Sequence, residues 1–107
     1  GACAFSSLAA MPEWLKSREG KAFSRAYAKT RQYISSSSAA TIAAAEKPLF
    51  PKIDEIVLEK CIEAYKVMGC WPTGTLITNE GYEAMLDIFE FDGKLSKRYA
   101  FEDICMH

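Results

Sequence analysis

The sequence contains a single histidine, His107, and no C-x-x-C pair among its four cysteines. Nucleophilic catalysis by Ser, Cys or Thr needs a well-placed base, which is most often histidine, so a catalytic triad is not expected. Widely separated cysteines with one histidine do not form a typical zinc site. We therefore assign no catalytic residue, no metal ligand and no cofactor, and we expect a protein that is not an enzyme.

Long apolar runs and an excess of one charge are also lacking. No stretch approaches the roughly 18 apolar residues of a membrane span, and the first residues lack the order of a signal peptide. A net charge of -1 from 13 basic and 14 acidic residues does not suggest a nucleic-acid partner. A length of 107 residues predicts one domain, 1–107.

Alternating apolar and polar residues, the mark of a half-buried strand, are scarce. The best candidates, Thr75 to Ile77 and Lys97 to Ala100, are short. We therefore predict an all-α fold, a small bundle of three longer helices with additional short helices. One short helix is expected to begin at Pro12, because proline is tolerated in a first turn.

The strongest helix signal runs from Ile53 to Trp71. Asp54 can cap its start, and Gly69 can adopt the left-handed conformation that ends it. Five residues recur at helical spacing and predict one buried face: Val57, Cys61, Ala64, Tyr65 and Met68. Trp71, just beyond the helix, is a candidate for ligand stacking, although core packing is the favoured interpretation.

A second amphipathic helix is predicted from Ser17 to about Ser35. Its basic residues could bind phosphate or a membrane, but a solvated face is the favoured interpretation in a net-acidic chain. The apolar face comprises Phe23, Ala26, Tyr27, Thr30, Tyr33 and Ile34, and the basic residues are Arg18, Lys21, Arg25, Lys29 and Arg31. Ser38 is expected to cap a short helix that ends before Pro48. Leu49 and Phe50 lie between Pro48 and Pro51, in a segment that is expected to be an extended connector. Their side chains are expected to fill the core.

The third long helix is predicted from Thr78 to Gly93. Its apolar face comprises Tyr82, Met85, Leu86 and Phe89, and Gly93 is its stop. Carboxylates at helical spacing on this segment, Glu80 with Glu83 and Asp87 with Glu90, are interpreted as a solvated surface. The tail places Lys94, Lys97 and Arg98 near the negative end of this helix, with a last turn from Phe101 to Cys105.

The cysteines leave the redox compartment open. Cys61 lies on the predicted apolar face, where a free thiol behaves as a small hydrophobe. A disulfide between Cys70 and Cys105 remains an alternative to two free thiols.

The second half of the chain resembles a known family. The segments ID-x-x-VLEKCIEAYK-x-MGCWP (Ile53 to Pro72), ITNEGYEAMLDIFEFDGKL (Ile77 to Leu95) and KRYAFEDI (Lys97 to Ile104) are similar to the C-terminal part of the NMT1/THI5-like substrate-binding proteins of ABC importers. That family includes binders of nitrate, taurine, alkanesulfonates and pyrimidine precursors. The AF-x-x-AY pattern within LAAMPEWLKSREGKAFSRAYAKTRQYI (Leu8 to Ile34) extends the resemblance to the first half.

The resemblance implies that the chain is the C-terminal piece of a two-lobed α/β periplasmic binding protein of type II, located on the periplasmic or extracellular face of the membrane. Its partners would be the N-terminal lobes of the parent protein and an ABC permease, and the whole protein would bind a small organic or oxyanion ligand. Since such lobes would hold most of the contacts, the ligand-binding residues in this piece are unknown.

Two alternatives belong to other classes. The first is a free-standing helical module that binds a partner or a second copy through four exposed aromatic residues, Trp14, Phe50, Trp71 and Phe91. The second is an iron-dependent pyrimidine synthase of the THI5 type. That enzyme would need a cluster of cysteines and histidines, which Cys61, Cys70 and His107 do not supply.

Overall fold

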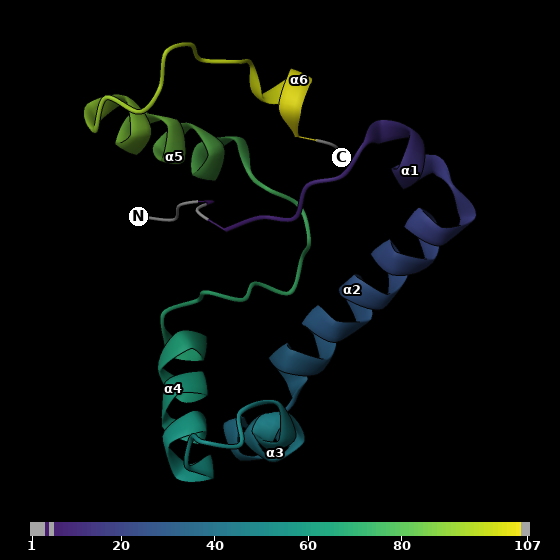
Figure 1. The fold of residues 1–107 in the computed structure, drawn as a ribbon, viewed down its shortest axis with the longest axis vertical. Coiled ribbons are helices and arrows are strands. Elements are labelled where there is room, and N and C mark those ends of the chain that lie inside the picture. Colours follow the sequence, from purple (N-terminus) through teal and green to yellow (C-terminus); the bar gives the residue numbers. More distant parts are fainter. Residues whose placement is uncertain (1–3, 5, 106–107) are drawn as a thin grey trace. The chain divides into compact units, whose positions relative to one another are not determined.

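The computed structural model describes residues 4 and 6–105 and is built from helices (Figure 1). In chain order the elements are α1 (Pro12–Lys16), α2 (Arg18–Ser36), α3 (Ala39–Glu46), the 3-10 helix η1 (Lys47–Leu49), α4 (Glu55–Val67), α5 (Asn79–Phe91) and α6 (Phe101–Ile104). No strand occurs in this described part of the chain, and both strand candidates are irregular. The all-α prediction is confirmed. No helix among the same residues combines the length and apolar character that crossing a bilayer requires.

The chain divides into two compact units, which are described separately. The first, the 13–75 unit, contains α2, α3, η1 and α4. The second, the 76–107 unit, contains α5 and α6 together with residues 1–12. The single domain over 1–107 stays a prediction.

The predicted helix ends are confirmed where local chemistry determines them. The Asp54 side chain accepts a hydrogen bond from the Ile56 amide at 2.9 Å and so begins α4. Gly69, with φ of 71°, ends it in the left-handed conformation. The remaining predicted ends agree: Ser17 caps α2, Ser38 caps α3, Thr78 caps α5, and Gly93 (φ 70°) follows α5.

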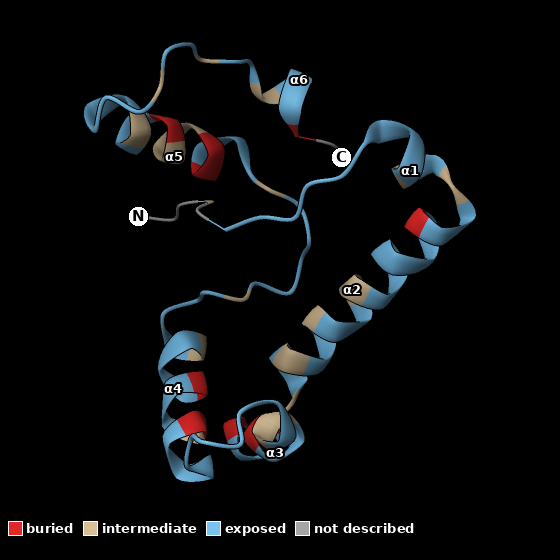
Figure 2. Ribbon diagram, in the orientation of Figure 1, coloured by how far each residue is buried: buried red, intermediate tan, exposed pale blue. Residues whose placement is uncertain are grey.

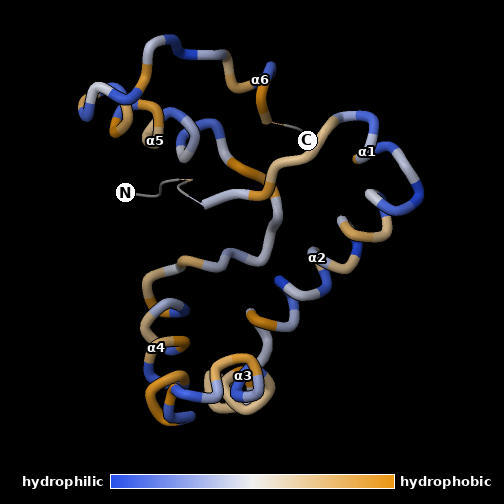
Figure 3. The backbone as a smooth tube through the Cα atoms, viewed as in Figure 1, coloured by the Kyte–Doolittle hydropathy of each residue, from blue (hydrophilic) through white to orange (hydrophobic). Residues whose placement is uncertain are grey.

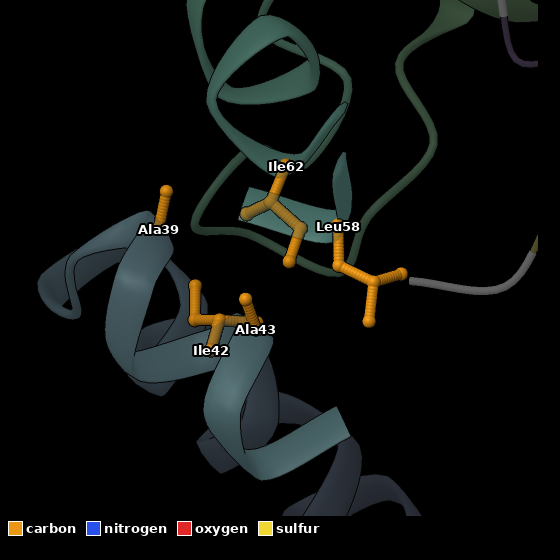
Figure 4. Packing of buried hydrophobic residues seen from close by; sticks show 5 residues of the cluster. All are labelled: Ala39, Ile42, Ala43, Leu58 and Ile62. Carbon is orange, nitrogen blue, oxygen red and sulfur yellow. The ribbon is translucent and has the colours of Figure 1, made fainter. Parts of the chain in front are cut away.

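The core of the 13–75 unit lies between α3 and α4. Five aliphatic side chains are buried there, and they face one another in Figure 4: Ala39, Ile42, Ala43, Leu58 and Ile62. The small alanines on α3 let the two helices approach closely. Ile34 at the end of α2 and Trp71 pack against the edge of this cluster. A short alanine-rich helix thus covers α4, instead of one of the longer helices.

The core of the 76–107 unit surrounds Tyr82. Its hydroxyl donates a hydrogen bond to the Tyr99 carbonyl at 2.9 Å, and its ring meets Phe101 edge-on at 5.7 Å. Leu86 and Cys105 complete the buried cluster, which Ile77, Met85, Leu95 and Phe101 surround. The predicted inward positions of α5 are therefore confirmed at Tyr82, Met85 and Leu86.

The connector after α3 differs from the prediction. Lys47 begins η1, and its amine donates to the carbonyls of Phe50, Pro51 and Ile53, which coils the segment into successive turns. In this coiled form Leu49 is 76% exposed and Phe50 is also exposed. The prediction that Leu49 and Phe50 fill the core is wrong, because the segment is coiled rather than extended.

Candidate interaction surface

Helix α4 carries two apolar stripes, and its own unit covers only one of them. Leu58 and Ile62 lie one turn apart and pack on α3 (Figure 4). The other stripe, which we call the α4 stripe, comprises Val57, Cys61, Ala64 and Met68. Val57 is 49% exposed and Met68 is 64% exposed, and Cys61 and Ala64 are exposed as well.

The prediction of a buried face along the α4 stripe and Tyr65 is therefore wrong within this unit. Apolar residues extend around much of α4, so helical periodicity alone does not tell which stripe a neighbour will cover (Figure 3). Ile56 and Val67, beside the stripe, are also exposed. An apolar surface of adjoining side chains on one helix is typical of a contact with another protein surface.

Trp71 belongs to the core edge and not to the exposed surface. It is partly buried, packs against the α3 and α4 cluster, and meets the Tyr65 ring edge-on at 5.4 Å. This agrees with the favoured interpretation of Trp71 as a packing residue. The other three aromatic residues of the predicted interaction module are exposed: Trp14, Phe50 and Phe91.

A row of aromatic rings lies along the first half of α2. The Trp14 and Phe23 ring centroids are 5.9 Å apart, and Phe23 stacks on Tyr27 at 6.4 Å with nearly parallel planes. The Arg31 guanidinium lies over the Tyr27 ring, 5.5 Å from its centroid. We call Trp14, Phe23 and Tyr27 the aromatic row.

A tight corner between α1 and α2 places Trp14 beside this row. Ser17 caps α2 by accepting a hydrogen bond from the Gly20 amide at 3.0 Å, while its own amide donates to the Trp14 carbonyl at 3.0 Å. Gly20 is buried against that carbonyl, where a side chain would collide. The close approach itself has no sequence signal.

Lys66 holds the end of α2 against α4. Its amine donates to the Ile34 carbonyl at 3.1 Å and to the Ser37 carbonyl. A cation at the negative end of a helix is favourable, since the last carbonyls have no partner within the helix. This lysine therefore has a structural role. It holds the C-terminal end of α2, whereas the aromatic row lies toward the N-terminal end of the same helix.

Arg98 fastens the tail onto α5. Its guanidinium lies 2.7 Å from Glu83, 2.9 Å from Asp87 and 2.8 Å from Glu90, which share one side of α5. Hydrogen bonds to Glu83, Asp87 and Glu90 raise the pKa of Arg98. These carboxylates were interpreted as a solvated face, and they remain largely exposed, but the sequence did not predict that Arg98 pairs with all three. A single arginine in the tail is a suitable partner for such a row.

The cysteines show no disulfide among the described positions. Cys61, Cys70 and Cys105 are free thiols, and burial raises the pKa of Cys105. Cys3 and His107 lie outside the described residues. Within residues 4 and 6–105, no group of three or more His, Cys, Asp or Glu could hold a metal ion.

Comparison of the chain with protein-family models, curated proteins and solved structures finds no match. The resemblance to solute-binding proteins stays a prediction that rests on the quoted segments alone.

Proposed function

We propose that the chain is the C-terminal helical region of the extracytoplasmic solute-binding component of an ABC importer for a small organic or oxyanion ligand. The observation that carries this proposal is the α4 stripe, which is apolar and exposed although the other apolar stripe of the same helix is packed on α3. In the proposal, the remaining part of a two-lobed binding protein covers the α4 stripe. The segments that resemble that family, 53–72 and 77–95, contain α4 and α5.

The physical role of the region in this proposal is support. Its helices cover one lobe on the hinge side, and closure of the lobes on the ligand is coupled to docking on the permease. No residue of the chain is assigned to the ligand, because the described side chains form no site of convergent polar groups that the resemblance would single out.

The native gene product provides the test. We expect a chain two to three times longer than a single small domain, as the two-lobed architecture requires, and we expect it to bind nitrate, taurine or an alkanesulfonate by calorimetry. The 107-residue chain should bind none of these ligands. A natural start codon just before Ala2, or a micromolar dissociation constant for the isolated chain, would contradict the proposal.

A second candidate is a free-standing helical module that associates with a second copy. Phe91, which is 95% exposed, favours it, as do the exposed Phe50 and Trp14. Sedimentation of the isolated chain should then show a dimer or larger species that a Phe91→Ser variant weakens. A monomer at every concentration would exclude this candidate and leave the solute-binding proposal intact.

A further inference from the structure

Helix α2 is the longest helix among the described residues, and its own unit covers little of it. Of its 19 residues, only Gly20 is buried, and most of the helix is pale blue in Figure 2. The aromatic row begins at one end of it, where Trp14 is 42% exposed and Phe23 is 48% exposed. Tyr33, nearly three turns after Phe23, is exposed as well. Large rings therefore face solvent along a helix that is about 28 Å long.

Positive charge accompanies these rings. Four cations of α2 are exposed, and none of them forms an ion pair with another described residue: Arg18, Lys21, Arg25 and Lys29. Glu19 is the only acidic residue in the helix. The helix is thus strongly basic in a chain whose net charge is -1. Its natural complement is a surface that is negative and that also accepts aromatic rings.

We propose that α2, with Trp14, is a docking surface for an anionic phospholipid membrane. A helix with Lys and Arg on its polar side and Trp or Phe on the other lies flat at the boundary between headgroups and acyl chains. Tyrosine and tryptophan suit that boundary, since each has an apolar ring and a polar tip. Basic residues near an anionic leaflet strengthen the attraction to it.

The arrangement of the rings favours lipid over an acidic protein. An amphipathic partner helix normally binds in a groove with apolar walls on both sides. The aromatic row is instead a single line of three rings, in which Trp14 is tilted against Phe23, Phe23 stacks on Tyr27, and the Arg31 guanidinium lies over Tyr27. A fluid lipid surface needs no matching groove. This inference does not depend on the proposed function.

Tryptophan emission provides the readout. The chain has two tryptophans, so a Trp71→Phe variant leaves Trp14 as the only one. The full chain is mixed with vesicles of phosphatidylcholine alone, or of phosphatidylcholine with phosphatidylglycerol. We expect the Trp14 emission to shift to shorter wavelength with the anionic vesicles only, and salt to reverse the shift. Phe23→Ser should abolish the shift, with helicity by circular dichroism as the folding control.

Charge variants separate this surface from general basicity. The double variant Lys21→Gln, Lys29→Gln should weaken vesicle partitioning about tenfold or more. Lys52→Gln, Lys60→Gln is the matched control, because both lysines are exposed in the same unit but lie outside α2. The control should partition like the parent chain.

Three results would overturn the inference. The first is no Trp14 shift with anionic vesicles, and the second is an equal loss of partitioning in the control variant. The third is a Trp14 response to soluble poly-glutamate and none to vesicles, which would identify an acidic protein as the partner.

Discussion

A Cβ atom on Gly20 would lie 2.1 Å from the carbonyl oxygen of Trp14. Such a distance is far below any non-bonded contact, and the atoms it would strike are backbone atoms that cannot rotate away. The corner between α1 and α2 therefore requires glycine at this position. Ser17, which caps α2 from inside the same corner, depends on that close approach.

Gly20→Ala should destabilise the 13–75 unit by roughly 1–3 kcal/mol, as overpacking does. At an ordinary position inside a helix, replacing glycine with alanine has the opposite effect and raises the free energy of unfolding by about 0.5–1 kcal/mol. Urea unfolding monitored by circular dichroism measures the change. Gly74→Ala is the control, since a Cβ there meets nothing within 4 Å. If the two variants have equal free energies of unfolding, the claim that the corner requires glycine at position 20 is wrong.

Leu58→Ala should reduce the free energy of unfolding by about 2–5 kcal/mol, because Leu58 is buried between α3 and α4. Val57→Ala, at the neighbouring position on the exposed stripe, should change it by less than about 0.5 kcal/mol. The two residues are adjacent in the sequence, so the comparison determines which side of α4 is packed. If Val57→Ala reduces the free energy of unfolding more than Leu58→Ala does, the packed stripe of α4 is the one that contains Val57. Thermal unfolding is a sufficient measurement.

Arg98→Gln should lower the urea midpoint of the 76–107 unit only slightly, because all three carboxylates and the arginine are partly exposed to solvent. High salt should reduce the difference between variant and parent. Lys94→Gln removes the same charge from an exposed position nearby and should have little effect. If the two variants lose the same stability at low salt, the contacts of Arg98 contribute nothing specific.

Alkaline pH should destabilise the 76–107 unit. Burial raises the pKa of both Tyr82 and Cys105, so the folded state favours their neutral forms. The unfolded chain loses these protons first, near pH 8.5 for a thiol and near pH 10 for a phenol, at about their ordinary values. Stability is therefore complete below about pH 8.5 and decreases as the pH rises through the raised pKa values.

Urea midpoints measured across this pH range check the alkaline effect. A variant with Tyr82→Phe and Cys105→Ala has neither group and should show a flatter pH dependence. Its stability at neutral pH will be lower, because the hydrogen bond to the Tyr99 carbonyl is lost. An unchanged slope in this variant would assign the alkaline effect to other groups.

Sequence reasoning succeeded where a helix end is determined by its own neighbours. Asp54 and Thr78 cap helices through amides two or three residues away, and Gly69 and Gly93 adopt positive φ within the same turn. The inward positions of α5 at Tyr82, Met85 and Leu86 were also predicted, from their spacing of three and four residues.

Three features depend on contacts distant in the sequence and were not predictable. The choice between the two stripes of α4 depends on α3, which covers Leu58 instead of Val57. The Arg98 contacts join residues 8 to 15 positions apart across an irregular segment. The need for glycine at position 20 arises from a backbone contact that no composition or periodicity reports.

The central claim is that the α4 stripe is an interface left uncovered in this chain, and Cys61 reports on it directly. In the 107-residue chain Cys61 is an exposed free thiol, so a maleimide should modify it readily, as peptide mapping by mass spectrometry will show. Cys105, which is buried, should react slowly and serves as the internal reference. In the longer gene product that the proposed function requires, we predict that Cys61 becomes as protected as Cys105. Modification of Cys61 at the same rate in both proteins would contradict the account.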